Sequence, residues 1–324
     1  MDKPRYLYII GNGFDLHHGI KSSYRNFRNW LNDTYPDLLN DIENVYGDCE
    51  EDWWSDFENN LASSDVICYA SRIAFENSPD LLSDHCDRTW DEAQIVVEQN
   101  LEKLYLELRE CFCEWILQLN PPEKDKMLDL HRKDTCFLTF NYTKTLEELY
   151  NIPSSQILHI HGCVGCNENL ILGHGKSYED LEKMNVYDIP DPPQSLPIEE
   201  YEAWSTENTK EFHEQLAEEA ALLGIVSQQK PVGELIHKYS PFFDSISSVE
   251  EVYVYGISFS KVDEPYLKKV ASVSSNAHWT LSYYGEVDMC KIREFIDKNN
   301  IENYNIIMLD DMVNRNQLRL QFIY

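Results

Sequence analysis

Five short stretches of this 324-residue chain carry polar side chains that could act on a nucleotide, and four of them contain glycine. The first stretch, Gly11-Asn12-Gly13-Phe14-Asp15, directly follows the apolar run 6–10. A turn between a strand and a helix offers backbone N–H groups and a helix N-terminus to a phosphate. The alternative is a tight structural turn in which Asp15 satisfies local amides. We favour the ligand site.

The second stretch is Thr139-Phe140-Asn141-Tyr142-Thr143, at the end of another predicted strand. An asparagine side chain offers a donor and an acceptor without charge, which suits holding a ribose hydroxyl or a water molecule. Asparagine also commonly caps helices, and a helix is expected to start near Thr143. Both interpretations of Asn141 stay open at this point.

The third stretch, His159-Ile160-His161-Gly162, also ends a predicted strand. Histidine titrates near neutrality, so it can take a proton from a sugar hydroxyl or from water. A packed histidine bonded to the backbone is the alternative. We favour a functional His161, because Gly162 lets a substrate approach closely.

Two weaker stretches repeat the change from apolar residues to glycine: Leu172-Gly173-His174-Gly175, and Tyr255-Gly256-Ile257-Ser258 with Asp263 beyond it. Together they predict one sheet edge rich in Gly, His, Ser and Asp. His17 and His18 differ, since they are expected to be solvated residues of the first helix.

These stretches must be positioned by strands that alternate with helices. Apolar, β-rich runs predict strands at 6–10, 135–140, 156–160, 169–172, 251–257, 279–284 and 305–309, with a last apolar stretch at 318–323. Helical periodicity predicts helices at 53–61, 90–119, 201–225, 232–237, 265–273 and 289–299. The pattern predicts an α/β fold with a doubly wound, mainly parallel, Rossmann-like sheet. Ligands of such sheets bind beyond the carboxyl ends of the strands, where the strand order reverses.

A large helical insertion is expected within this fold. We assign residues 1–20 and 131–324 to a nucleotide-binding core, and residues 21–130 to a helical insertion or lid without a convincing strand. The aromatic stripe Trp53, Trp54, Phe57 and Leu61 is best explained as core packing. Glu58, on the same helix, could serve as a lid carboxylate.

Composition narrows the class of protein. A formal net charge of −30 repels nucleic acid and anionic lipid, so nucleic acid is an unfavoured partner. With no signal sequence and no stretch of about 20 apolar residues, we expect a cytoplasmic protein without a membrane span. Nine irregularly spaced cysteines favour free thiols. Cys163 and Cys166 have the spacing of half a zinc site, but no second pair is found.

The motifs Ile10-Gly-Asn-Gly-Phe-Asp-Leu, Trp54-Ser-Asp-Phe-Glu, Phe140-Asn-Tyr-Thr, Ile160-His-Gly and Tyr255-Gly-Ile-Ser-Phe occur in this order. Their order and spacing resemble those of the AbiH family of bacteriophage abortive-infection proteins, and they span most of the chain. The resemblance implies a role in bacterial defence in which an infected cell stops growing. It also implies a phage or host protein as trigger, and a homo-oligomer is one possible assembly.

The same motifs resemble, more distantly, those of sirtuin-like NAD-consuming domains. This resemblance implies that Gly11 and Gly13 contact the pyrophosphate of NAD, that Asn141 holds the nicotinamide ribose and water, and that His161 is the base. The remaining NAD contacts would be Asn12, Phe14, Asp15, Thr139, Gly162, Gly256 and Ser258. The chain departs from that pattern at Phe14-Asp15-Leu16, at Thr143, and in having no evident zinc ribbon.

Three functions follow as hypotheses. The first is hydrolysis of the bond between nicotinamide and ribose, through an oxocarbenium-like transition state. The second is a non-catalytic sensor of NAD, ADP-ribose or another nucleotide that acts through partners. The third is a metal-dependent nuclease using Asp15, Glu58, His161 or Asp263, which the acidic composition ranks last.

Overall fold

The computed structural model describes residues 3–47, 49, 51–78, 90–165, 170–184, 197–198, 200–201, 204 and 210–309. The chain forms two compact units. The first consists of residues 1–29, 111–172 and 230–324, and the second of residues 30–110 and 173–229. The second unit therefore contains residues 173–229, which the sequence analysis assigned to the nucleotide-binding core.

The first unit is built on a six-stranded parallel sheet. Its strands are β1 (Tyr6–Ile10), β2 (Thr135–Thr139), β3 (Ile157–His159), β4 (Glu251–Tyr255), β5 (His278–Tyr283) and β6 (Tyr304–Met308). They lie in the order β3-β2-β1-β4-β5-β6. This is the doubly wound order in which the direction of winding reverses between β1 and β4. The Rossmann-like α/β fold predicted from the sequence is confirmed.

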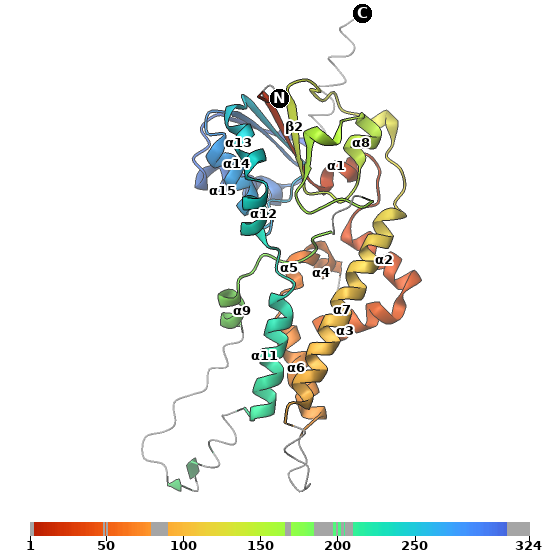
Figure 1. Cartoon of the computed structure of the whole chain (residues 1–324), viewed down its shortest axis with the longest axis vertical. Helices are drawn as coiled ribbons and strands as arrows, with labels where there is room; N and C mark the ends of the chain where they lie inside the picture. The colour runs from red at the N-terminus through yellow and green to blue at the C-terminus, as the bar shows by residue number, and fades with distance from the viewer. Residues whose placement is uncertain are drawn as a thin grey trace, which may run out of the picture. The chain divides into compact units, whose positions relative to one another are not determined.

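Helices cover both faces of the sheet (Figure 1). One face packs against α12 (Val232–Lys238), α13 (Ser240–Ser245), α14 (Glu264–Val273) and α15 (Glu286–Lys298), and the other against α1 (Asn12–His17) and α8 (Thr145–Tyr150). Alternate residues of β1 pack into the hydrophobic cores on the two faces of the sheet. Leu7 and Ile9 belong to one core, and Tyr8 and Ile10 belong to the other. Both cores are apolar because side chains of a strand point alternately to its two faces.

The described part of the second unit consists mainly of helices, with one isolated parallel bridge between His174 and Gln229. The helices are α3 (Pro36–Tyr46), α4 (Glu51–Ser55), α5 (Phe57–Asn60), α6 (Asp65–Glu76), α9 (Tyr178–Met184) and α11 (Phe212–Val226). The unit boundaries fall within α2 (Tyr24–Thr34) and α7 (Glu92–Leu117). Trp54, Phe57 and Leu61 are fully buried, as expected for core packing. Within the described part of 21–130, the prediction of helix without strand is confirmed.

Short 3-10 helices complete the described elements: η2 (Lys124–Lys126), η3 (Ser154–Gln156) and η4 (Ile246–Ser248). One predicted strand is wrong, because residues 170–172 are not a strand. Ile171 in that segment makes two hydrogen bonds outside any strand ladder. Its N–H donates to the His161 carbonyl (2.9 Å), and its carbonyl accepts from the Tyr142 hydroxyl (2.9 Å). The predicted helix 201–225 is described from Phe212 onward as α11, and the apolar stretch 318–323 lies outside the described residues.

None of the helices in the described ranges has both the length and the apolar character that a bilayer crossing demands.

Candidate functional site

The register of the sheet brings four of the predicted stretches level with one another. Ile10 pairs with Thr139 on one side and Tyr255 on the other, and Thr139 pairs with His159. The residues that follow β1, β2, β3 and β4 therefore leave the sheet at the same carboxyl edge. In a doubly wound sheet this edge, at the switch between β1 and β4, is where ligands bind.

The turns after β1 and β4 pack backbone against backbone. Gly13 N donates to the Gly256 carbonyl (2.9 Å), and Gly11 N donates to the Tyr255 carbonyl (2.9 Å). A methyl group added at Gly13 would lie 2.6 Å from Gly256 Cα, and one added at Gly256 would lie 2.5 Å from Gly13 Cα. Gly256 also has a φ of +64°, in the left-handed region. Both glycines are thus required by the packing of the two turns.

Asn12 and Phe14 hold the first turn in place. The Ser22 hydroxyl donates to Asn12 Oδ1 (2.5 Å), while Asn12 Nδ2 donates to the Ser22 carbonyl (3.0 Å). The Phe14 ring is 1% exposed and packs near Tyr150 and Tyr255 in the core. Both side chains therefore make contacts within the protein, although Asn12 is exposed and Phe14 is buried.

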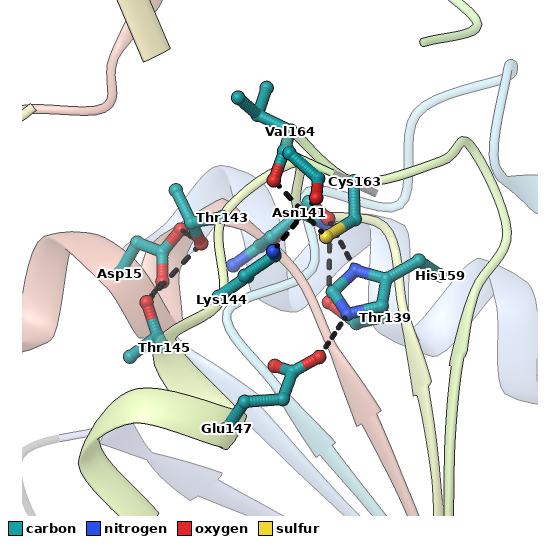
Figure 2. A network of polar contacts seen from close by, with 11 residues as sticks. Asp15, Thr139, Asn141, Thr143, Lys144, Thr145, Glu147, His159, Cys163 and Val164 are labelled. Atoms are coloured by element: carbon teal, nitrogen blue, oxygen red, sulfur yellow. Dashed lines mark hydrogen bonds and ion pairs between the residues drawn. The ribbon is translucent and has the colours of Figure 1, made fainter. Parts of the chain in front are cut away.

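Asp15 lies at the centre of a buried hydrogen-bond network (Figure 2). Its Oδ2 accepts from the Thr143 hydroxyl (2.5 Å), and its Oδ1 accepts from the Thr145 hydroxyl (2.7 Å). Burial raises the pKa of the Asp15 carboxyl above its ordinary value, although the two hydroxyls partly offset this effect. The network ties α1 to the loop before α8. It also joins Asp15 and Thr143, two positions at which the chain departs from the sirtuin-like pattern.

The expectation that His18 is solvated is wrong, because its side chain is fully buried. Its Nδ1 lies 2.7 Å from the Phe14 carbonyl, and its Nε2 lies 2.7 Å from the Tyr150 hydroxyl. Burial lowers the pKa of His18 to about 4. Helical spacing places His18 on the inner side of the first turn, where it supports Phe14.

Asn141 is buried next to the first turn. Its Nδ2 donates to the Gly11 carbonyl (3.1 Å), and its backbone N–H donates to the Thr139 hydroxyl (3.1 Å). It does not cap α8, which begins at Thr145 after Lys144. Its side-chain oxygen, Oδ1, is buried without a hydrogen-bond partner. Asn141 thus presents an unused acceptor at the carboxyl edge of β2.

His161, two residues beyond β3, is 2% exposed. Its ring makes edge contacts with Phe140 and Tyr266 and stacks near Tyr142. Lys230 Nζ lies 3.3 Å from its Nδ1. Burial, and then the charge of Lys230, lower the pKa of His161 well below its ordinary value, so the ring is neutral. Its Nε2 is buried without a hydrogen-bond partner.

The loops that carry Asn141 and His161 are tied together. Val164 N donates to the Tyr142 carbonyl (3.0 Å), and Lys144 Nζ donates to the Gly165 carbonyl (3.2 Å). The His159 ring bridges the same loops, with Nδ1 3.2 Å from the Asn141 carbonyl and Nε2 3.0 Å from Glu147 Oε1 (Figure 2). The bonds hold the ends of β2 and β3 as one rigid region.

Sequence reasoning missed three residues of this region: Thr145, Glu147 and Lys230. Thr145 and Glu147 follow Asn141 closely, so the polar residues at the start of α8 were a usable signal. Lys230 is separated from His161 by 69 residues. No local pattern marks it, because a lysine before a helix is ordinarily solvated.

The other predicted residues have different surroundings. Gly162 has a φ of +82°, which fits the tight turn after His161. Ser258 is exposed, and its carbonyl accepts from Lys291 Nζ (3.4 Å). Ser260 donates to Asp263 at the start of α14 (3.2 Å). Glu58 belongs to the second unit.

His174 does not follow a strand, contrary to expectation, and belongs to the second unit. It is fully buried, with Nε2 2.9 Å from the Ile225 carbonyl and Nδ1 accepting from Lys176 N (3.1 Å). Both of its nitrogens are used within the protein. Its role is structural.

The cysteines in the described ranges, including buried Cys163, are free thiols as predicted. Cys166 lies outside the described residues. Among the described residues, no group of three or more His, Cys, Asp or Glu side chains is arranged to hold a metal ion. The nuclease hypothesis and the role of the cysteine pair stay predictions.

Comparison with known proteins gives one match. A family model described as bacteriophage abortive infection AbiH matches residues 7–283. This range covers β1 from its second residue onward, β2 to β5, and every predicted site residue from Gly11 to Ser258. No curated protein and no solved structure matches the chain.

Proposed function

The chain belongs to the AbiH family of bacteriophage abortive-infection proteins. From this premise we propose that it contributes to abortive infection by binding NAD at the carboxyl edge of its sheet and hydrolysing the bond between nicotinamide and ribose. The observation that supports the proposal is a pair of buried polar atoms without a protein partner, Asn141 Oδ1 and His161 Nε2. They follow neighbouring strands, and their loops are tied together.

A buried polar atom without a partner costs roughly 1–3 kcal/mol, so native proteins rarely keep one without a use. A ligand hydroxyl can donate one hydrogen bond and accept others. A ribose, with adjacent hydroxyls, can therefore give a hydrogen to Asn141 Oδ1 and take part in a second bond with His161 Nε2. In this proposal the ribose next to nicotinamide lies over the ends of β2 and β3.

The switch between β1 and β4 accommodates the rest of the dinucleotide in this proposal. Doubly wound sheets of this strand order bind dinucleotides across that point, with the phosphates near the first turn. The phosphates would lie along the backbone of Gly11 to Gly13, and the adenosine end near Gly256 and Ser258. Because Asn12 bonds to Ser22 and Phe14 packs in the core, their contribution is to shape the turn.

The reaction is NAD plus water giving ADP-ribose, nicotinamide and a proton. Nicotinamide leaves with the electrons of its bond to ribose C1′, and water adds to the oxocarbenium ion. The leaving group needs little acid catalysis, so the residues act chiefly by position. Asn141 Oδ1 holds the ribose hydroxyl or the attacking water, and His161 holds the ribose.

Nicotinamide release from NAD tests this function. His161→Ala and Asn141→Ala should each lower turnover by about 100-fold or more, because misplaced reacting groups cost rates of that order. His278→Ala is the matched control, since His278 begins β5 at the opposite edge of the sheet and bonds to Asn305. Its turnover should equal that of the wild type. Wild-type activity in both folded site variants would refute the proposal, with folding checked by thermal unfolding.

A non-catalytic NAD or ADP-ribose sensor is the second candidate. It is favoured by the low pKa of His161 and by the position of Lys230 against its Nδ1, which together make His161 a poor proton acceptor. Saturable binding of NAD without release of nicotinamide, lost in Asn141→Ala, would support the sensor over the hydrolase. Capture from infected cells, with the full chain as bait, would identify the partners that trigger either activity.

A further inference from the structure

The contact between Lys230 and His161 joins two buried groups from different parts of the first unit. Lys230 lies two residues before α12, and His161 lies two residues after β3. Each side chain is 2% exposed, and Lys230 Nζ lies 3.3 Å from His161 Nδ1. Burying a lysine has a high free-energy cost, so its position beside a histidine calls for an explanation.

An ammonium group carries three donors and no acceptor. When Lys230 is charged, His161 Nδ1 must therefore be the acceptor, and the ring hydrogen must lie on Nε2. We propose that Lys230 is a positioning residue that fixes His161 as the Nε2–H tautomer, so that His161 donates a hydrogen bond to an acceptor oxygen of the ligand. The identity of that oxygen, a ribose hydroxyl, rests on the proposed function, whereas the tautomer does not.

Two other buried histidines show how neighbours fix a tautomer in this protein. The Phe14 carbonyl requires a hydrogen on His18 Nδ1, and the Tyr150 hydroxyl, which accepts from Leu128 N (2.8 Å), donates to His18 Nε2. The backbone N–H of Lys176 donates to His174 Nδ1, so the His174 hydrogen lies on Nε2, facing the Ile225 carbonyl. In both rings the N–H group finds a protein acceptor. Of these three histidines, His161 is the one whose N–H group has none.

The electrostatics agree with a donor role. Burial is the largest cause of the lowered His161 pKa, and the Lys230 charge adds to it. A neutral ring with its Nδ1 lone pair directed at Lys230 cannot readily take up a second proton. It can, however, offer a fixed N–H group, and a pre-positioned donor needs no reorganisation when the ligand binds.

The test is nitrogen-15 NMR of the histidine side chains in the full chain without ligand, with His161→Gln used to assign the signals. The wild type should show His161 with a protonated Nε2 and an unprotonated Nδ1. His18 and His174 serve as internal references for the Nδ1–H and Nε2–H forms. A wild-type His161 signal of the Nδ1–H form, or of a mixture, would overturn the inference.

Two substitutions isolate the role of Lys230. Lys230→Met keeps the length of the side chain but removes the donor, so an Nδ1–H population should appear and His161 should protonate at higher pH. Lys230→Arg keeps a group that only donates, so it should retain the Nε2–H form. Unchanged His161 signals in a folded Lys230→Met protein would contradict the proposal. A merely structural lysine would not shift these signals selectively.

This experiment separates the inference from the proposed function. If the tautomer depends on Lys230 but NAD is neither bound nor cleaved, the inference holds and the assignment of NAD fails. If NAD is cleaved while the Lys230→Met spectrum is unchanged, the proposed function holds and Lys230 has no positioning role. With both correct, Lys230→Met raises the KM for NAD more than Lys230→Arg does.

Discussion

Two sides of the carboxyl edge differ in how their polar side chains are satisfied. Beside β1, the side chains of Asn12, Asp15 and His18 each use both of their polar atoms in hydrogen bonds within the protein. Beside β2 and β3, Asn141 and His161 each use one polar atom within the protein and leave the other buried without a partner.

This difference suggests that one side supports the fold and that the other side binds a ligand. Satisfied groups hold the turn after β1 in shape and contribute to the stability of the fold. Buried polar groups without a partner lower the stability of the fold unless a ligand forms the missing hydrogen bond. The β1 side should therefore control folding, and the β2–β3 side should control function. The three predictions below test this division.

Gly256→Ala should have the largest effect on stability. The added methyl group would meet Gly13 Cα and Phe14 N at 2.5 Å, and the residue would keep a φ of +64°. Overpacking and a left-handed alanine together should lower the free energy of unfolding by about 3 kcal/mol or more. Chemical denaturation measures this loss.

Gly233→Ala is the control for that change, because an added methyl group there meets nothing within 4 Å. It lies in α12, where alanine is favoured over glycine by roughly 0.5–1 kcal/mol. Equal stability of the two variants would mean that the glycines do not hold the turns together.

His18→Leu and His161→Leu should separate the two sides directly. His18→Leu leaves the Tyr150 hydroxyl without its acceptor, so we expect a loss of about 2 kcal/mol. His161→Leu removes the unpartnered Nε2, which offsets part of the cost of the lost contact with Lys230, so its loss of stability should be smaller than that of His18→Leu. Thermal and chemical unfolding measure both variants. Equal losses of stability in the two variants would contradict the assignment of folding to the β1 side and of ligand binding to the β2–β3 side.

Asp15→Asn should have the smallest effect, a change within about 1 kcal/mol at pH 7, because an amide can still bond to both threonine hydroxyls. This substitution should change how the stability depends on pH. The pKa of folded Asp15 is raised above 3.8, so the folded state binds the proton more tightly than the unfolded state does. As the pH falls through the folded pKa, the wild type should gain stability relative to Asp15→Asn. Parallel stability curves from pH 7 to pH 4 would contradict this account.

Much of the fold could be predicted from the sequence, because strands buried on both faces leave local signals. The run 6–10 matches β1 at both ends, and the runs at 135, 251, 279 and 305 match strands to within one or two residues. The strand predicted at 169–172 is wrong over its described residues, 170–172, since a short apolar run can also be a buried loop. Leu170 and Leu172 are buried there without strand pairing.

The candidate site was predicted less completely. Asn141 and His161 were predicted because each follows a strand and, in the case of His161, precedes a glycine, and their roles stay predictions. The close packing of Gly13 against Gly256 is a reason for these glycines that the sequence did not indicate. The predicted solvent exposure of His18 was wrong, because the first helix is short and the side that carries His18 faces Tyr150.

The sequence by itself determined the class of fold, the family and the residues that leave the strands at one edge, because these depend on local periodicity and on short motifs. Tertiary structure alone decided which polar atoms are satisfied and which are not. Lys230 meets His161 across 69 residues, and Asp15 meets Thr143 across 128. Hydrogen-bond partners so distant in sequence are set by the packing of the sheet and its helices, and it is this packing that leaves Asn141 Oδ1 and His161 Nε2 without partners.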